Sequence, residues 1–211
     1  MLLLAGCPNL EYLRAEHIFV HCDQDSLTIQ EFKSVSLPKL ISADITQCWF
    51  PCFPVKALSS SEHLCVETSM LCKQDHKVYE IDPRQCPCYD IPIFHNLTHL
   101  ELHDTLELVP QVLKYCPKLQ NLELYEEEHE EVGLEENWVE PEVVPQCLSS
   151  CLRNCTIHNL SGELIIAKYI LKNARNLQMM EIWSIMDDQS EIERKLSACP
   201  KASATCQLFI H

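Results

Sequence analysis

Glycine is scarce in this sequence, with only Gly6, Gly133 and Gly162 among 211 residues. The phosphate-binding loop of nucleotide hydrolases and the dinucleotide-binding fingerprint both need clustered glycines, which allow tight turns and close approach of the backbone to phosphate. The nucleophile elbow G-x-S-x-G needs them as well. The shortage therefore argues against nucleotide sites and against this class of hydrolase.

Long apolar runs are missing too. The apolar run of residues 1–5 ends at Gly6 with no basic residue before it, whereas a signal peptide needs an apolar run of roughly 7–15 residues. No stretch approaches the roughly 18 apolar residues of a membrane helix. We therefore expect an intracellular protein of the cytoplasm or nucleus, without a membrane partner.

Basic residues are few, since 16 Lys and Arg against 31 Asp and Glu give a formal net charge of −15. Such a chain repels nucleic acid and anionic lipid, so we expect no nucleic-acid partner. Residues 126–142 hold nine glutamates and no Lys or Arg. A run of like charge repels itself, which favours a solvated linker, with a cation or a basic partner as the alternatives.

Cysteine, by contrast, is abundant, with 14 residues, and glycosylation sequons begin at Asn96, Asn154 and Asn159. Both features occur in secreted disulfide proteins. Without a signal sequence, we interpret the cysteines as small buried hydrophobic residues of a reducing compartment. No two of them have the C-x-x-C spacing of zinc ribbons, although spacings of four residues occur at Cys48, Cys52, Cys147, Cys151 and Cys155.

Two other patterns come close to a metal or catalytic site. His95, His99 and His103 are four residues apart, but the leucines between them favour a strand, which scatters histidines that a helix would gather. Residues 129–133 form half of a zincin motif and have Gly133 where the second histidine belongs. We therefore expect no metal, no cofactor and no enzymatic activity, so that no residue is assigned a catalytic role.

A short pattern recurs along the chain: a Pro or Asn, then Leu-x-x-Leu-x-Leu or a close variant. The first five central apolar residues are separated by 30, 21, 36 and 22 residues, which brackets the leucine-rich-repeat period of about 20–29. In each copy the last two apolar residues are two apart, as on one face of a strand. The central residues are Leu13, Ala43, Leu64, Leu100, Leu122 and Met180.

Helical patterns lie between these predicted strands. Residues 106–113 form one, and residues 163–175 form the clearest, with an apolar stripe, Ser161 as a candidate cap and Lys172 near the end. Strand then helix, repeated, predicts an α/β fold: a leucine-rich-repeat solenoid with parallel strands on one face and helices on the other. Because one unit cannot bury its apolar face alone, neighbouring units must stack.

The C-terminal third carries a distinctive set of segments. It resembles the FBD domain, the C-terminal module of the plant F-box/FBD/leucine-rich-repeat family, and the segments at 37–40 and 94–102 resemble that family's repeats. The resemblance implies leucine-rich repeats over 1–125, an acidic linker over 126–137 and an FBD domain over 138–211. The segments that carry it are Trp138–Pro141, Val144–Leu152, Cys155–Ile157, Ala167–Ala174 and Cys199–Leu208.

The same resemblance implies the function. Family members recruit protein substrates to an SCF-type ubiquitin ligase, and their F-box docks on the adaptor of the cullin ligase. No F-box pattern is found within this chain, so we expect adaptor binding only if an F-box lies upstream. The alternative to a protein-recognition module is a truncated or degenerate fragment without activity of its own.

The predicted binding surface is the strand-lined face of the solenoid, because residues between the buried apolar positions project from it. A row of acidic, histidine and aromatic side chains suits recognition of a protein partner, with the aromatic residues as anchors. The candidate partner-binding residues are Tyr12, Arg14, Asp44, His63, Glu67, His99, Glu101, Asn121, Glu123, Tyr125, Glu181 and Trp183.

Overall fold

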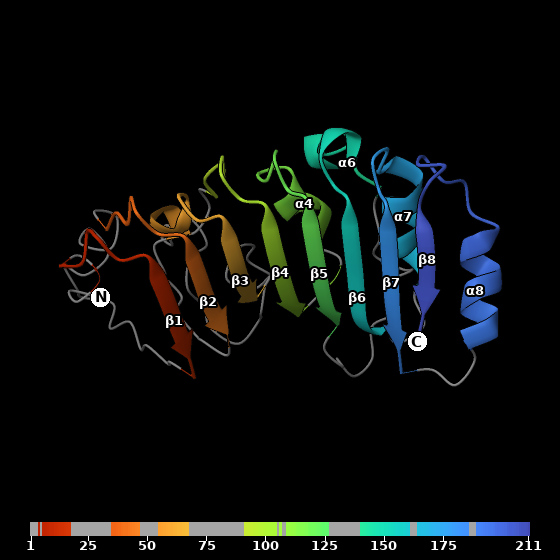
Figure 1. The fold of residues 1–211 in the computed structure, drawn as a ribbon, viewed down its shortest axis with the longest axis horizontal. Helices are drawn as coiled ribbons and strands as arrows, with labels where there is room; N and C mark the ends of the chain where they lie inside the picture. Colours follow the sequence, from red (N-terminus) through yellow and green to blue (C-terminus); the bar gives the residue numbers. More distant parts are fainter. Residues whose placement is uncertain are drawn as a thin grey trace, which may run out of the picture.

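The computed structural model describes residues 4, 6–17, 35–46, 55–67, 91–104, 106, 109–126, 140–160, 164–185 and 189–211. Within them, strands alternate with short helices (Figure 1). In chain order the elements are β1 (Tyr12–Glu16), β2 (Ser42–Thr46), the 3-10 helix η1 (Val55–Leu58), β3 (His63–Glu67), β4 (His99–Asp104), α4 (Val109–Leu113), β5 (Asn121–Glu126), α6 (Gln146–Ser150), β6 (Asn154–Leu160), α7 (Ile165–Asn173), β7 (Met179–Ser184), α8 (Gln189–Ser197) and β8 (Gln207–Ile210).

The strands form one open eight-stranded sheet in sequence order, β1 to β8, and every neighbouring pair is parallel. Figure 1 shows them side by side, with α4 and α7 behind the sheet and α8 beside β8. Parallel neighbours need long crossover connections, which is what the repeat spacing provides. The α/β solenoid predicted from that spacing is confirmed.

The same backbone joint links each repeat to the next. The carbonyl oxygen of Glu11 accepts hydrogen bonds from the N–H groups of Ile41 (2.8 Å) and Ser42 (3.1 Å). Five further carbonyls each accept two N–H groups of the following unit in the same way. This recurrence holds the strands in register from β1 to β7. The five carbonyls belong to Ile41, Glu62, Thr98, Gln120 and Arg153.

Two apolar rows on one face of the sheet form the core. All six predicted central residues lie in the first row, which Cys155 and Leu208 complete. Both rows are buried from β2 to β7, whereas their members on β1 and β8 are only partly buried, because each edge strand has a single neighbour. The second row consists of Ala15, Ile45, Val66, Leu102, Leu124, Ile157, Ile182 and Ile210.

Helix α7 is close to its prediction over 163–175. Its apolar stripe is buried against the core, and Lys172 lies in the last turn as expected. Ser161 lies outside the described residues, and Leu164 at the N-cap makes no side-chain capping bond. The stripe consists of Ile166, Ala167, Ile170, Leu171 and Ala174.

The other helical predictions need changes. Within the helix expected over 106–113, the described helix α4 comprises Val109–Leu113, with Pro110 as its second residue; residues 107–108 lie outside the described residues. Proline is favoured in the first helical turn, where its missing N–H costs nothing. Helix α8 and strand β8 were not among the predicted elements.

The prediction that the cysteines fill the core is correct in part. Of the eight described cysteines, all free, Cys116, Cys147 and Cys155 are buried, while Cys7 is exposed. Cys7 opens its repeat as Cys116 does, but it precedes β1, which is an edge strand of the described sheet. The remaining four are partly exposed: Cys65, Cys151, Cys199 and Cys206.

The acidic segment lies largely outside the described residues. Glu126, expected to begin the linker, is instead the last residue of β5. At the other end of the glutamate run, Glu140 accepts a hydrogen bond from Lys172 of α7 at 2.7 Å. The domain bounds 1–125, 126–137 and 138–211 otherwise stay a prediction, because the sheet continues through both proposed domains.

Among the described residues, no helix has the length and apolar character that crossing a bilayer requires.

The buried rows predict a sharp difference between adjacent residues of β5. Leu124 is fully buried, so we expect Leu124→Ala to lower the free energy of unfolding by about 2–5 kcal/mol through lost burial and the cavity left behind. Urea unfolding followed by circular dichroism measures this change. The matched control is Glu123→Ala on the exposed face, for which we expect a change within about 0.5 kcal/mol. Equal effects of the two substitutions would contradict the assignment of the faces.

Candidate functional site

All twelve predicted binding residues lie on strands and on the face opposite the core. Along each strand they alternate with residues of the core rows, which are buried on β2 and partly buried on the edge strand β1. The in-register pairing aligns the exposed side chains in rows that cross the sheet. The strand geometry thus places the predicted residues on one surface, although their role in binding stays a prediction.

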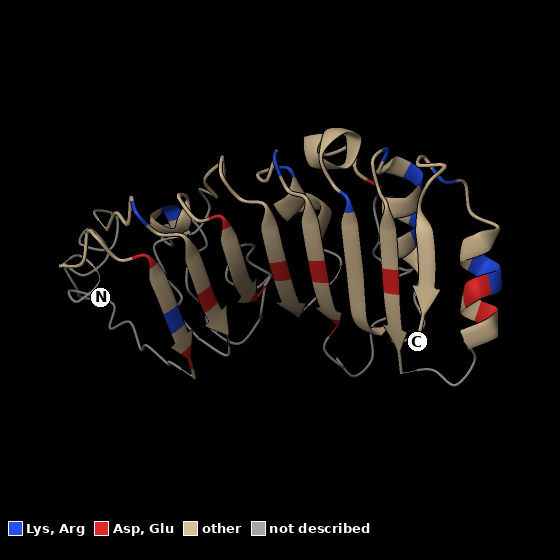
Figure 2. Ribbon diagram, in the orientation of Figure 1, with Lys and Arg blue, Asp and Glu red and all other residues tan. Residues whose placement is uncertain are grey.

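An acidic row crosses the middle of this face. Figure 2 shows it as red bands at similar height on β2, β4, β5 and β7. Asp44 forms an ion pair with Arg14 at 3.4 Å, whereas Glu101 and Glu123 are direct partners in register. Like charges placed opposite one another destabilise a sheet, so this arrangement favours a cationic ligand. The row consists of Asp44, Glu101, Glu123 and Glu181, with Cys65 and Thr156 between them.

The acidic row borders a groove of about 540 Å³ that extends over β1 to β5. Five carboxylates and three histidines line this groove, together with Cys65, and no Lys or Arg is among its lining residues. Arg14 is not a lining residue but pairs with Asp44 and Glu16. Five carboxylates against this guanidinium leave the potential of the groove negative. The charged lining residues are Glu16, Asp44, Glu67, Glu101 and Glu123.

Stacked rings form a second row beside the acidic one, hereafter the ring ladder. His103 stacks on Tyr125 at 4.5 Å between ring centroids, and Tyr125 stacks on His158 at 4.2 Å. Trp183 follows at 6.3 Å from His158 and stacks on His211 at 4.2 Å. The longer step coincides with a register shift between β6 and β7, so the bulge there separates two otherwise close stacks.

A chain of polar contacts forms the third row. Asn154 donates to Asn121 (2.7 Å), whose amide nitrogen contacts His99 Nε2 (2.8 Å). The other ring nitrogen, Nδ1, lies 2.9 Å from Thr98 Oγ1, and this hydroxyl donates to the carbonyl of Glu62. Because the Thr98 hydroxyl proton is used in the bond to Glu62, Thr98 Oγ1 must accept from Nδ1–H of His99. Nε2 of His99 then accepts from the amide nitrogen of Asn121. His99 is therefore neutral, with its proton on Nδ1.

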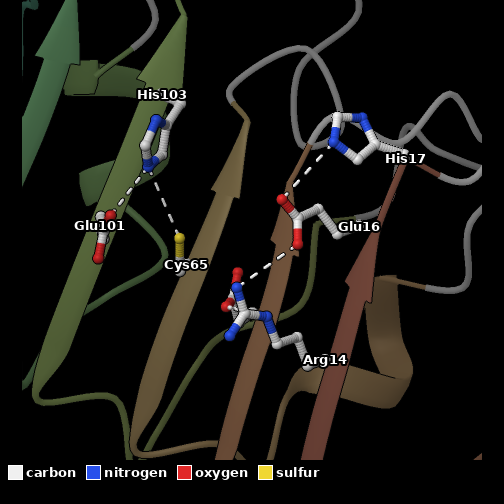
Figure 3. Close-up of polar contacts among 7 residues, drawn as sticks. Arg14, Glu16, His17, Cys65, Glu101 and His103 are labelled. Carbon is white, nitrogen blue, oxygen red and sulfur yellow. Dashed lines mark hydrogen bonds and ion pairs between the residues drawn. The ribbon is translucent and has the colours of Figure 1, made fainter.

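His103 joins the acidic row to the ring ladder. Its Nε2 lies 2.9 Å from Glu101 Oε1 and 3.7 Å from Cys65 Sγ (Figure 3). The hydrogen bond from His103 is the main cause that holds the pKa of Glu101 below its usual value. Burial raises the pKa of the Cys65 thiol, and the nearby charges of Glu101 and Asp44 raise it further.

Four contributors to this face are missing from the candidates predicted from sequence: Cys65, His103, His158 and His211. His103 follows Glu101 by two residues on the same strand, so the alternation that selects Glu101 would also have selected it. Cys65 was assigned to the core by residue type, although its position between Leu64 and Val66 places it on the exposed face. His158 directly follows the segment Cys155–Ile157 and continues its alternation, and β6 extends from Asn154 to Leu160 and includes it. His211 lies beyond β8, which was not predicted.

The spacings of the histidines and cysteines predict no metal site. His95 and His99 belong to no candidate ligand cluster among the described residues, nor do Cys147, Cys151 and Cys155. Cys48, Cys52 and the half motif at 129–133 lie outside the described residues. His103 does belong to one such cluster, with Cys65 and Glu101.

Comparison with known proteins points to a plant family. The FBD family model matches residues 140–182. An F-box/FBD/LRR-repeat protein of Arabidopsis thaliana is 30% identical over 140 residues, which covers 63% of this chain and 31% of the relative. An FBD-associated F-box protein of the same plant is 30% identical over 200 residues, which covers 90% of this chain and 43% of the relative.

The chain thus spans less than half the length of these curated relatives. No solved structure matches this chain.

The chain of polar contacts around His99 predicts a lowered pKa for its ring. We expect its pKa to lie below 6.5, because burial disfavours the charged ring and His63, stacked at 4.2 Å, opposes a second positive charge. His63→Asn should raise the pKa of His99, as measured by NMR titration of the imidazole protons. An unchanged value in this variant would contradict the contact with His63.

The sign of the linked stability change follows from this depressed pKa. As the pH falls below 6.5, the unfolded chain binds the proton before the folded protein does. The stability that neutral His99 contributes is therefore present above pH 6.5 and decreases as the pH falls from there towards the folded pKa. Urea unfolding across this range should show a smaller decrease for His99→Gln, which has no titrating ring.

Proposed function

Since this chain is a relative of the plant F-box/FBD/LRR-repeat proteins, we propose that it is a non-enzymatic recognition module whose exposed sheet face binds a basic segment of a partner protein. The observation that carries the proposal is the acidic row running beside the ring ladder on one continuous face. By family resemblance, the partner is a substrate recruited to an SCF-type ubiquitin ligase in the cytoplasm or nucleus.

Charge complementarity selects the chemistry of the partner. Four carboxylates in one row, and a groove lined by five, attract Lys and Arg side chains and raise the rate of encounter. Arg14 is the basic residue on this face of β1, and it is already paired with Asp44 and Glu16. A basic segment would relieve the repulsion between Glu101 and Glu123.

The ring ladder supplies the anchors. Trp183 is 46% exposed, and Phe209 of β8, which pairs in register with Glu181 of the acidic row, is 41% exposed. Large exposed rings contribute much of the binding energy at interfaces, and a guanidinium stacks on such ring faces. An arginine-rich segment therefore satisfies both rows, whereas a purely apolar partner satisfies only the ladder.

The dimensions set the length of the bound segment. Strands in a sheet lie about 4.8 Å apart, so the acidic row from β2 to β7 extends about 24 Å. An extended peptide covers this distance with about seven residues. We therefore expect a short, extended basic segment that crosses the strands.

These residues would serve in recruitment of the substrate rather than in assembly of the ligase. The F-box named in the relatives is the part that docks on the cullin adaptor by family resemblance. We therefore expect the 211-residue chain alone to bind a basic partner without binding the adaptor.

Charge reversal on the exposed face tests the proposal. We expect Glu123→Lys with Glu181→Lys to weaken binding of a fluorescent eight-residue Arg/Ser peptide at least tenfold, or about 1.4 kcal/mol, because both carboxylates lie in the acidic row. Trp183→Ala should weaken it further through the loss of a stacking surface. Fluorescence anisotropy at fixed salt concentration measures the affinities.

The matched control changes the net charge by the same amount elsewhere. Glu142 and Glu193 are exposed and lie outside the strand-lined face, so Glu142→Lys with Glu193→Lys should retain most of the affinity. Equal loss in both double variants would show that only net charge matters, and would overturn the assignment of the face. Proteins that the unaltered chain captures from plant extract should be lost with Glu123→Lys/Glu181→Lys but kept with Glu142→Lys/Glu193→Lys. After purification, these proteins should bind the unaltered chain directly.

A further inference from the structure

Three side chains of different chemistry converge in the groove between β3 and β4. The Cys65 thiol, a Glu101 carboxylate oxygen and a His103 ring nitrogen all lie within 4.8 Å of one another (Figure 3). Cys65 and Glu101 are direct partners in register, and His103 follows Glu101 by two residues on the same face. The sheet thus brings together a sulfur, an oxygen and a nitrogen donor from positions 38 residues apart.

The separations of these donors suit a tetrahedral metal ion. Typical zinc bonds of about 2.0–2.3 Å place two ligand atoms roughly 3.4–3.6 Å apart at the tetrahedral angle. Cys65 Sγ lies 3.7 Å from His103 Nε2, close to that value. His103 Nε2 lies 2.9 Å from Glu101 Oε1, a hydrogen-bond distance that must open by about half an ångström when an ion replaces the shared proton.

The surroundings of the cluster favour a cation. Glu101 and Asp44 both raise the pKa of the Cys65 thiol, after burial, which is the largest cause. The same negative charges that make the thiolate costly would stabilise a divalent ion bound to it. The groove around the cluster has no Lys or Arg among its lining residues to compete for these ligands.

The orientation of His103 is already fixed. Its ring stacks on Tyr125 with an interplanar angle of 3°, and Tyr125 stacks in turn on His158. A ligand ring held by its neighbours loses less freedom when it binds a metal. Nε2, the nitrogen directed at Glu101 and Cys65, is the atom that would coordinate the ion.

We propose that Cys65, Glu101 and His103 form a binding site for a divalent transition-metal ion of the zinc type, with a fourth coordination position open to the groove. The thiol loses its proton on binding, and the ion links β3 to β4. Thiolate, imidazole and carboxylate together favour zinc or cobalt over magnesium or calcium, which prefer oxygen ligands alone. This inference stands on the geometry of the cluster and does not depend on the proposed recognition function.

Cobalt(II) provides a direct test, because a bound thiolate gives a charge-transfer band in the near ultraviolet. We expect the reduced 211-residue chain to show this band on titration with cobalt, and zinc to displace it. Cys65→Ser should remove the component that saturates at one equivalent. His103→Ala should weaken the affinity for zinc at least tenfold, measured by competition with a chromophoric chelator.

Another partly exposed thiol provides the matched control. Cys206 lies before β8 and belongs to no ligand cluster among the described residues, so Cys206→Ser should leave the spectrum and the zinc affinity unchanged. Circular dichroism of the metal-free variants confirms that they fold. Absence of the band would overturn the proposal, as would persistence of its one-equivalent component in Cys65→Ser. Unchanged zinc affinity in His103→Ala would overturn it as well. Binding of the Arg/Ser peptide to Glu123→Lys with Glu181→Lys tests the recognition function separately.

Discussion

The in-register stacking of parallel strands is the constraint on which the rest of this structure depends. One carbonyl per unit accepts two N–H groups of the next, from Glu11 through Arg153. This joint aligns residues that lie 21 to 36 positions apart in sequence, such as Leu100 with Leu122. Because side chains alternate along a strand, the same register that buries the leucine rows also aligns every exposed side chain into rows.

Those exposed rows explain how an irregular repeat can carry a specific surface. The acidic row, the ring ladder and the polar chain each take one residue from successive strands, so their chemistry is set by single positions within each repeat. His103 belongs to the ladder through Tyr125 and contacts the acidic row through Glu101. A change at such a position therefore affects two rows at once, whereas a change at Glu123 leaves the ladder intact.

Much of the architecture could be predicted from sequence, because burial leaves a periodic signal. The six central apolar residues, the α7 stripe and the exposed side of each strand all follow from alternation and helical spacing. The weaker signals failed where one residue type suggested the wrong environment. Cys65 is of a residue type common in cores but lies on the exposed face. Cys7 repeats the Cys-Pro step of the buried Cys116 but is itself exposed.

The α/β solenoid and the family resemblance could be inferred from the chain alone, since repeat period and apolar alternation are local properties. The same alternation placed the twelve predicted side chains on the face away from the core. Which side chains of that face come into contact follows from the folded sheet alone: the stacking of His103 on Tyr125, the neutral tautomer of His99, and the approach of Cys65 to Glu101 and His103. The physical reason is that crossover connections of variable length separate the strands, so contacts between neighbouring units depend on register, which no local pattern encodes.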